Sequence, residues 1–289
     1  MTAAALTEPT RRPLLRRLRP LGGGPLFTAA VLLLAALVLV AVLAPLLSPY
    51  DPEAVDLLSP LAGSSAGHLL GTDQSGRDVL SRLLYGSRTG LLGPLLVVGL
   101  STVLGILLGT VAGWRGGWVD TVLSRLLDLV FSVPGLLLAI MFVAVSGPGL
   151  TAPVIAMSVA YTPYVGRLVR GLAQQEKARP YLESYRVQGW SGWTICLRHL
   201  LPNIAPTVLA QSAINFGYAL MDLAGLSFLG FGAQPPAADW GAMINEGETA
   251  LQQGAMLPAL APSACIVLAV VAFGIVGEGI ADRLARRER

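Results

Sequence analysis

The sequence predicts an all-α membrane protein with six transmembrane helices and with both termini in the cytoplasm. The chain is 54% hydrophobic and only 13% charged, whereas soluble domains carry about 25% charged residues. Its apolar residues gather in blocks long enough to cross a bilayer core about 30 Å thick, which takes about 20 helical residues. The basic residues, in addition, fall almost entirely on one side of these blocks.

Six blocks are long enough to span a membrane. The first is the clearest, because residues 29–44 include no polar side chain and so lack the polar face that a helix of a soluble protein needs. This block is also longer than the apolar region of a secretory signal, which has about 7–15 residues. The fifth block carries Asn215 and Asp222 and is the least uniform. The expected spans are 25–47, 89–112, 123–146, 150–172, 204–232 and 257–281.

The positive charges orient these spans. Five arginines between residues 11 and 19 precede the first span and place the N-terminus in the cytoplasm. Because six is an even number of crossings, the C-terminus is expected on the same side of the membrane as the N-terminus. Of the 20 Lys and Arg residues, only Arg77, Arg82 and Arg88 then fall outside. The net charge of +3 therefore reflects membrane orientation, and we expect no nucleic-acid partner.

Residues 48–88 form the expected external segment. From Asp78 onward, the apolar positions Val79, Leu80, Leu83 and Leu84 recur at helical spacing with polar residues between them. This pattern predicts an amphipathic helix that lies on the outer membrane surface before the second span. The remaining expected parts are a cytoplasmic N-terminal tail (1–24), a core transmembrane domain (89–281) with a cytoplasmic loop (173–204), and a cytoplasmic C-terminal tail (282–289).

Small residues predict close packing of the helices. Glycines recur in the second span at spacings of six, four and four residues. In lipid, small side chains let helix backbones approach one another. The positions are Gly99, Gly105, Gly109 and Gly113.

The stretch 174–206 is a polar, arginine-rich interruption between two apolar spans. Glu183 lies six residues before Gly189, and Pro202 follows Gly189 by thirteen, with helix-compatible sequence between them. Two helices joined by a break near Gly189 would project a short helix into the cytoplasm. Such an element can enter a groove on a partner and transmit its movement. The alternative is an ordinary positively charged cytoplasmic loop.

Three polar residues are candidates for a translocation pathway or for the bundle interior. Asp222 falls inside a span, where a carboxylate is costly unless it faces a cavity or a partner. It therefore either lines a substrate or proton pathway or packs at an interface of the bundle, and Asn215 shares its span. Asp128 lies three residues after Arg125, which favours a local ion pair.

The cytoplasmic stretch resembles the pattern EAA-x-x-x-G-x(9)-I-x-L-P of permease subunits of binding-protein-dependent ABC importers. The matching residues are Glu183 and Gly189, and the stretch ends in RHLLPN, which contains Leu201 and Pro202. Ser184 and Tyr185 stand where the family usually has alanines.

Further motifs resemble the C-type subunit of the dipeptide, oligopeptide and nickel branch of this family. They are HLLGTDQSGRDVLSRLLYGSR, GGWVDTVLSRLLDLVFSVPGLLLAI, LSFLGFGAQPPAADWGAMINEG and GEGIADRL, in the family's order. Three positions depart from the family. Leu223, beside Asp222, stands where a glutamate is usual, and Gly274 and Glu278 replace a usual Asn and Asp.

The resemblance implies a type I ABC importer permease fold in the bacterial cytoplasmic membrane. It implies a heterodimer with a homologous B-type permease, two cytoplasmic ATPase subunits and an external solute-binding protein. The implied ATPase-coupling residues are Glu183, Ser184, Tyr185, Arg186, Gly189, Leu201 and Pro202. Among them, Glu183 and Arg186 would contact the ATPase, Gly189 would shape the bend, and Pro202 would fix re-entry into the membrane. The external loop 233–256 is the expected contact for the binding protein.

No chemistry is expected within this chain, and neither a cofactor site nor a metal site. Lys177 is the only lysine and lies in QEKAR, so no G-x-x-x-x-G-K-[ST] loop exists to hold ATP phosphates. His68 and His199 are expected on opposite sides of the membrane. Cys196 and Cys265 are far apart in the topology, which disfavours a disulfide. Magnesium-bound ATP is expected on the partner ATPases.

The predicted function is import of dipeptides, oligopeptides, nickel or metal chelates, driven by ATP hydrolysis in the partners. One alternative is a stand-alone ion-coupled secondary transporter that uses Asp222 or Asp128 as its carrier. Another is a structural membrane subunit of an energy-converting complex, which needs no substrate cavity.

Overall fold

The computed structural model describes residues 24–287, and these form an all-helical bundle with no strand beyond one isolated bridge between Thr72 and Asp78. Residues 1–23, with the N-terminal arginines, lie outside the described residues. The elements are α1 (Pro25–Leu47), α2 (Val79–Arg115), α3 (Gly117–Phe131), α4 (Gly135–Ser146), α5 (Thr151–Lys177), α6 (Pro180–Val187), α7 (Gly192–Ile195), a π-helical turn η1 (Cys196–Leu200), α8 (Leu201–Phe228), α9 (Trp240–Gln252) and α10 (Leu257–Arg287).

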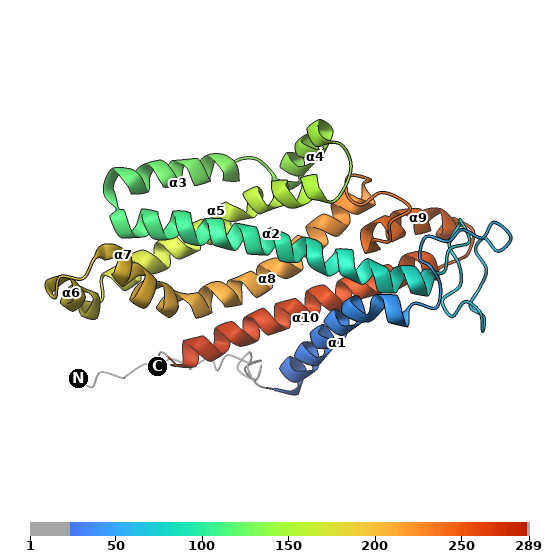
Figure 1. Ribbon diagram of the computed structural model, residues 1–289, viewed down its shortest axis with the longest axis horizontal. Helices are drawn as coiled ribbons and strands as arrows, with labels where there is room; N and C mark the ends of the chain where they lie inside the picture. The colour runs from blue at the N-terminus through green and yellow to red at the C-terminus, as the bar shows by residue number, and fades with distance from the viewer. Residues whose placement is uncertain (1–23, 288–289) are drawn as a thin grey trace, which may run out of the picture.

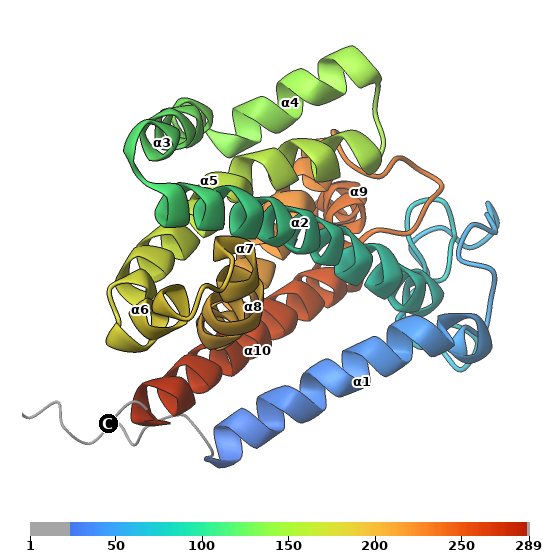
Figure 2. The same ribbon diagram turned by 60° about the vertical axis from the view of Figure 1, so that its left-hand side comes forward.

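The long helices α1, α2, α5, α8 and α10 follow the long axis of the molecule (Figure 1). The hairpin of α6 and α7 lies at one end of this bundle, whereas α9 and the segment before α2 lie at the other. Figure 2 shows α1 on the outside, along α10 and α2. The expected cytoplasmic loop and the expected external segment are therefore at opposite ends of the molecule.

Among the described helices, α1, α2 and α10 are long and apolar enough to cross a membrane by length and composition. The bent pair of α3 and α4 would add a fourth crossing if it forms one span. Helices α5 and α8 have 27 and 28 residues, enough in length for a span, but they carry more polar side chains. The number of six spans stays a prediction.

The expected span 123–146 is not a single helix. The axes of α3 and α4 differ by 78° across the break between Phe131 and Gly135. Pro134 explains the break, because its ring supplies no N–H and disfavours the helical conformation of the residue before it. With 12 residues, α4 alone is about 18 Å long, which is shorter than the bilayer core.

The separate surface helix expected after Asp78 is the first part of α2. Asp78 caps this helix by accepting a hydrogen bond from the Ser81 N–H at 2.8 Å, and the helix continues without interruption to Arg115. Ser81 and Arg82 are buried, so the polar positions of the pattern face protein instead of water. In the same way, α10 extends to Arg287, and most of the expected tail 282–289 continues this helix.

Helices α2 and α5 pack closely through the glycines of α2, as the sequence predicted. A Cβ atom on Gly105 would lie 2.6 Å from the Val165 Cβ, and one on Gly109 would lie 2.5 Å from the Gly166 carbonyl oxygen. No larger side chain fits this approach. Gly99 has open space around it and takes no part in the contact.

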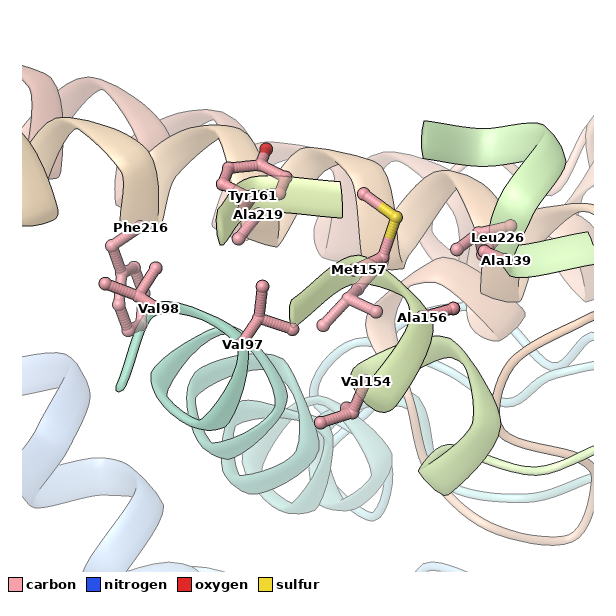
Figure 3. Packing of buried hydrophobic residues seen from close by; sticks show 11 residues of the cluster. Val97, Val98, Ala139, Val154, Ala156, Met157, Tyr161, Phe216, Ala219 and Leu226 are labelled. Atoms are coloured by element: carbon pink, nitrogen blue, oxygen red, sulfur yellow. The ribbon is translucent and has the colours of Figure 1, made fainter. Parts of the chain in front are cut away.

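Between α2, α5 and α8 lies the largest group of buried apolar side chains (Figure 3). Val97 and Val98 come from α2, Met157 from α5, and Phe216 and Leu226 from α8. The cluster holds the three helices together and supports one side of the cavity described below.

Candidate functional site

The hairpin of α6 and α7, residues 178–200, lies in the loop expected in the cytoplasm and has the bend that the sequence predicted. Pro180 lies in the first turn of α6, where its missing N–H costs no hydrogen bond. After α6, Gly189 has φ +81°, a conformation that favours glycine. The Ser191 hydroxyl oxygen then caps α7 by accepting a hydrogen bond from the Thr194 N–H at 3.2 Å.

A buried carboxylate ties the hairpin to the bundle. Glu176, at the end of α5, accepts hydrogen bonds from the Tyr181 hydroxyl and from Asn203 Nδ2 at 3.0 Å, and Arg179 lies 3.0 Å from its other oxygen. Asn203 Nδ2 also lies 2.7 Å from the Tyr181 hydroxyl. Because these residues belong to α5, α6 and α8 and the turn between α5 and α6, the network joins three helices. Burial, with the hydrogen bond to Glu176, raises the pKa of Tyr181 to about 12, so the phenol stays protonated at neutral pH.

An aromatic stack fills the inside of the hairpin. The Tyr185 and His199 rings are stacked at a centroid distance of 4.1 Å, and the Trp190 ring lies 5.3 Å from Tyr185. The Arg186 guanidinium lies 4.8 Å from the Trp114 ring of α2, a distance that allows a cation–π contact. Tyr185 therefore packs inward, and its bulk does not enlarge the outer face of α6.

The outer face of α6 is open to solvent. The Glu183 side chain is 70% exposed and lies 3.7 Å from Arg186, while Val187 is 83% exposed. Ser184 is exposed as well. Together with neighbouring residues they line a shallow hollow, which consists of Ala178, Arg179, Pro180, Glu183, Ser184, Val187 and Gln188.

The remaining predicted coupling residues lie at the base of the hairpin. Leu201 and Pro202 form the first turn of α8, directly after the π-helical turn η1. The Leu201 N–H bonds to the Cys196 carbonyl oxygen across the π-helical turn, and Pro202, which has no N–H, interrupts the hydrogen-bond ladder at this junction. Leu201 packs against the buried cluster that contains Leu200 and Ile204. These two residues thus fix where the hairpin joins α8 and do not face the outer hollow.

A second candidate site is a cavity of about 620 Å³ between α5, α8 and the break that separates α3 from α4. We call it the polar cavity. Asp222 and Asn215 both line it, as do three tyrosines. The Tyr161 hydroxyl donates a hydrogen bond to Asp222 Oδ2 at 2.8 Å. The full lining is Phe131, Val133, Pro134, Gly135, Leu136, Met157, Ala160, Tyr161, Tyr164, Gln211, Asn215, Tyr218 and Asp222.

Asp128 lies apart from this cavity, and its predicted ion pair was wrong. Its Oδ1 lies 3.9 Å from Arg167 Nη2 on α5, whereas no contact with Arg125 within 4.0 Å occurs in the described chain. Packing of α3 against α5 brings Arg167 near, where its guanidinium also lies 3.9 Å from the Phe131 ring centroid. The i, i+3 spacing alone did not reveal this partner.

Sequence reasoning missed the other polar residues of the cavity. A signal existed, since Gln211, Asn215, Tyr218 and Asp222 follow one another at spacings of four, three and four residues. Such spacing places them on one face of a helix. The residues Glu176, Tyr181 and Asn203 of the hairpin network were missed as well, and no spacing in the sequence connects them.

Comparisons with known proteins agree with this architecture. Residues 105–289 match the model of the family described as "Binding-protein-dependent transport system inner membrane component". The glutathione transport system permease protein GsiD of Pectobacterium atrosepticum is 39% identical over 259 residues, which cover 89% of this chain and 85% of that protein. The probable D,D-dipeptide transport system permease protein DdpC of Escherichia coli is 35% identical over 264 residues, covering 91% and 88%. The di/tripeptide transport system permease protein DppC of Pseudomonas aeruginosa is 37% identical over 260 residues, covering 88% and 86%.

The fold also matches a solved structure. A chain of the inward-facing MetNI methionine ABC transporter superposes with a TM-score of 0.58 at 18% identity, covering 73% of this chain and 97% of that one. The likeness confirms the predicted type I ABC importer permease fold. With several apolar helices, the protein is a multi-pass protein of the cytoplasmic membrane. The chain belongs to the family of inner membrane components of binding-protein-dependent transport systems.

Proposed function

We propose that this chain is the permease subunit of an ATP-driven importer of small peptides, and that it has no catalytic site of its own. The relatives reported above are named for glutathione, D,D-dipeptides and di- or tripeptides. All three solutes are short peptides. They favour peptides over nickel and metal chelates, which the same branch of the family also carries.

The proposed complex contains a homologous B-type permease, two cytoplasmic ATPases that bind magnesium and ATP, and an external solute-binding protein. The observation that supports the ATPase contact is the outer face of α6. It combines an exposed carboxylate, Glu183, with an exposed apolar side chain, Val187, on a helix whose inner face is tied to the bundle. The contact would use Glu183 and Ser184 directly, while Tyr185, Arg186, Gly189, Leu201 and Pro202 hold the hairpin in shape.

Movement of α6 would reach the polar cavity through hydrogen bonds that connect α6 to α5 and α8. Glu176, Tyr181 and Asn203 join α6 to α5 and α8, and these two helices also carry the polar residues of the cavity. A displacement of α6 by the ATPases would therefore shift both walls of the cavity. The coupling transfers work only if ATP or substrate binds the two states with different affinity.

The test is purification of the complex from membranes with measurement of its ATP hydrolysis. We expect ATPase subunits to co-purify, and we expect Glu183→Ala to lower solute-stimulated hydrolysis by roughly tenfold, as for loss of a charge-assisted hydrogen bond of about 1.5 kcal/mol. Gly189→Val should have a similar effect, because valine disfavours a positive φ. Glu53→Ala, which removes an exposed carboxylate near the opposite end, is the matched control and should leave hydrolysis unchanged.

The rival functions predict different results. A secondary transporter would move solute as a lone chain without ATP, and its ion coupling would be lost in Asp222→Asn. A structural subunit would co-purify with a larger complex and show no solute dependence. Either outcome would contradict the importer proposal.

A further inference from the structure

The negative charge of the polar cavity suits the binding of a cation. Among the described residues that line it, Asp222 alone has an ionisable acidic or basic group other than a phenol. No Lys, Arg or His of the described chain lies within 4.0 Å of this carboxylate. Tyr161 donates to Oδ2, and Oδ1 accepts no hydrogen bond from the described residues. A carboxylate in a span is costly without a partner, so a cation that enters the cavity would be stabilised there.

A second, independent observation points to a ligand. Asn215 is only 6% exposed. Its Oδ1 accepts a hydrogen bond from Gln211 Nε2 at 3.0 Å, but its buried Nδ2 has no partner in the described structure. An amide donor left without an acceptor costs about 1–3 kcal/mol. An oxygen acceptor brought by a ligand would remove this cost.

Aromatic rings surround the space between these two groups. Tyr164 and Tyr218 are 57% and 54% exposed and line the cavity. Phe131 lies edge-on to Tyr164 at a centroid distance of 5.0 Å, and Tyr161 lies 6.1 Å from Tyr164. The faces of such rings attract an ammonium group and disfavour an anion.

The dimensions fit a short peptide. Asn215 and Asp222 are seven residues apart on α8, or about 10 Å along the axis. An extended peptide advances about 3.3–3.6 Å per residue, so this separation corresponds to about three residues. The cavity of about 620 Å³ falls in the usual range for small-molecule sites, which is about 300–1,000 Å³.

We propose that the polar cavity is a transit site for a tripeptide, or for the amino-terminal part of a longer peptide. Asp222 pairs with the protonated terminal amine, the tyrosines surround it, and Asn215 donates to a peptide carbonyl oxygen. This inference rests on the proposed import of peptides and adds the residues that recognise the substrate inside the membrane.

The site can be probed by protection from thiol labelling in the complete transporter complex. Ala160 lines the cavity without a polar role, so Ala160→Cys, in a background with Cys196→Ser and Cys265→Ser, supplies a reporter thiol. We expect trialanine to slow maleimide labelling of this thiol at least threefold, and N-acetyl-trialanine, which lacks the charged amine, to have little effect.

Substitutions of the carboxylate separate charge from shape. Asp222→Asn keeps the size and the acceptor for Tyr161 but removes the charge, and should weaken protection by trialanine about tenfold, a change of about 1.4 kcal/mol. Asp222→Glu should retain protection. Ser212→Ala is the matched control on α8, because the Ser212 hydroxyl bonds to Thr102 of α2 at 3.1 Å and not to the cavity.

Each result decides for or against the site. Equal protection by the acetylated peptide, unchanged protection in Asp222→Asn, or no protection by trialanine would overturn the proposal. Labelling reports occupancy and not ATP use. If the peptide protects the thiol but no ATPase subunit co-purifies, the binding site is supported and the import function is contradicted. If the complex imports peptide with ATP but the thiol is not protected, the import function is supported and the binding site is contradicted.

Discussion

The two ends of the molecule, which the charge pattern predicts to be external and cytoplasmic, are held together by different physical means. At the external end, Arg77 and Arg82 pair with Asp73 and Glu246 at distances of 2.5–2.9 Å, and Arg82 is only 1% exposed. This cluster joins the segment before α2 to α9. Beside it, the buried Trp240 donates a hydrogen bond to the backbone of α2 at 3.0 Å.

At the cytoplasmic end, the hairpin has one buried carboxylate, a stack of aromatic rings and an open outer face. Its inward contacts come from hydrogen bonds and ring contacts, each worth about 1 kcal/mol, and from one ion pair, which joins Glu176 to the largely exposed Arg179. Buried charges, by contrast, cost several kcal/mol to separate. The difference indicates an external end that stays rigid and a cytoplasmic end that moves with modest energy, as the proposed displacement of α6 by an ATPase requires.

The largest expected effect comes from breaking the external cluster. Arg82→Met should lower the free energy of unfolding by about 3–5 kcal/mol, because it leaves Asp73 and Glu246 with fewer partners in a buried place. Thermal unfolding of the detergent-purified complex, followed by tryptophan fluorescence, measures this loss. Arg88→Met, at an exposed external arginine, is the control and should change little. Equal melting of the two variants would show that the cluster is not a strong constraint.

The hairpin network should show a smaller effect. Tyr181→Phe removes one donor to buried Glu176, and we expect a cost of about 1–2 kcal/mol that is confined to residues 176–203. Hydrogen exchange should quicken there, and solute-stimulated ATP hydrolysis should fall. Ser184→Ala, which removes an exposed hydroxyl of the same helix, should leave exchange unchanged. Loss of stability at the external end in Tyr181→Phe would argue against independent ends.

Loss of the aromatic stack should lower the stability of the hairpin by less than loss of the hydrogen bond from Tyr181. Tyr185→Ala, which restores the residue usual in the family, should cost about 0.5–1.5 kcal/mol through loss of ring contacts with His199 and Trp190. Amide exchange in residues 185–190 should quicken while the ATPases still co-purify, because Tyr185 packs inward. If the ATPases dissociate without faster exchange, Tyr185 instead belongs to the contact surface.

The smallest change to the protein is the labelling of a single thiol, Cys196, measured as a function of pH. Burial raises the pKa of the Cys196 thiol to about 11, and only the thiolate reacts with maleimide. At constant protein conformation, the labelling rate should therefore rise about tenfold per pH unit from pH 7 to pH 9 and level off only near pH 11. The Cys265→Ser background isolates this thiol. A plateau near the ordinary value of about 8.5 would show that the hairpin opens readily.

The sequence predicted those features that depend on local composition and spacing. Apolar blocks predicted the long helices, the glycines of the second span predicted close packing without indicating the partner helix, and Gly189 predicted the bend in the hairpin. The motifs around Glu183 identified the family before any coordinates. Local pattern sufficed for each of these features, because chain conformation and solvation act over a few residues.

The wrong expectations concern long-range packing. Asp128 pairs with Arg167 instead of the nearby Arg125, since α5 lies against α3. The amphipathic pattern after Asp78 reflects burial under the external segment and α9, and not contact with a membrane surface. A further difference is local, because the expected span 123–146 is bent at Pro134 into two helices, and that proline is visible in the sequence.

By itself, the sequence determined a helical membrane protein of the importer permease family, with a polar stretch at 174–206 that bends near Gly189. Tertiary structure alone decided that Tyr161 of α5 meets Asp222 of α8, and that Glu176 connects the hairpin to both helices. Helix formation follows from local hydrogen bonding and hydropathy. The meeting of polar side chains from distant helices follows from how apolar faces and glycines pack, and no local pattern encodes that register.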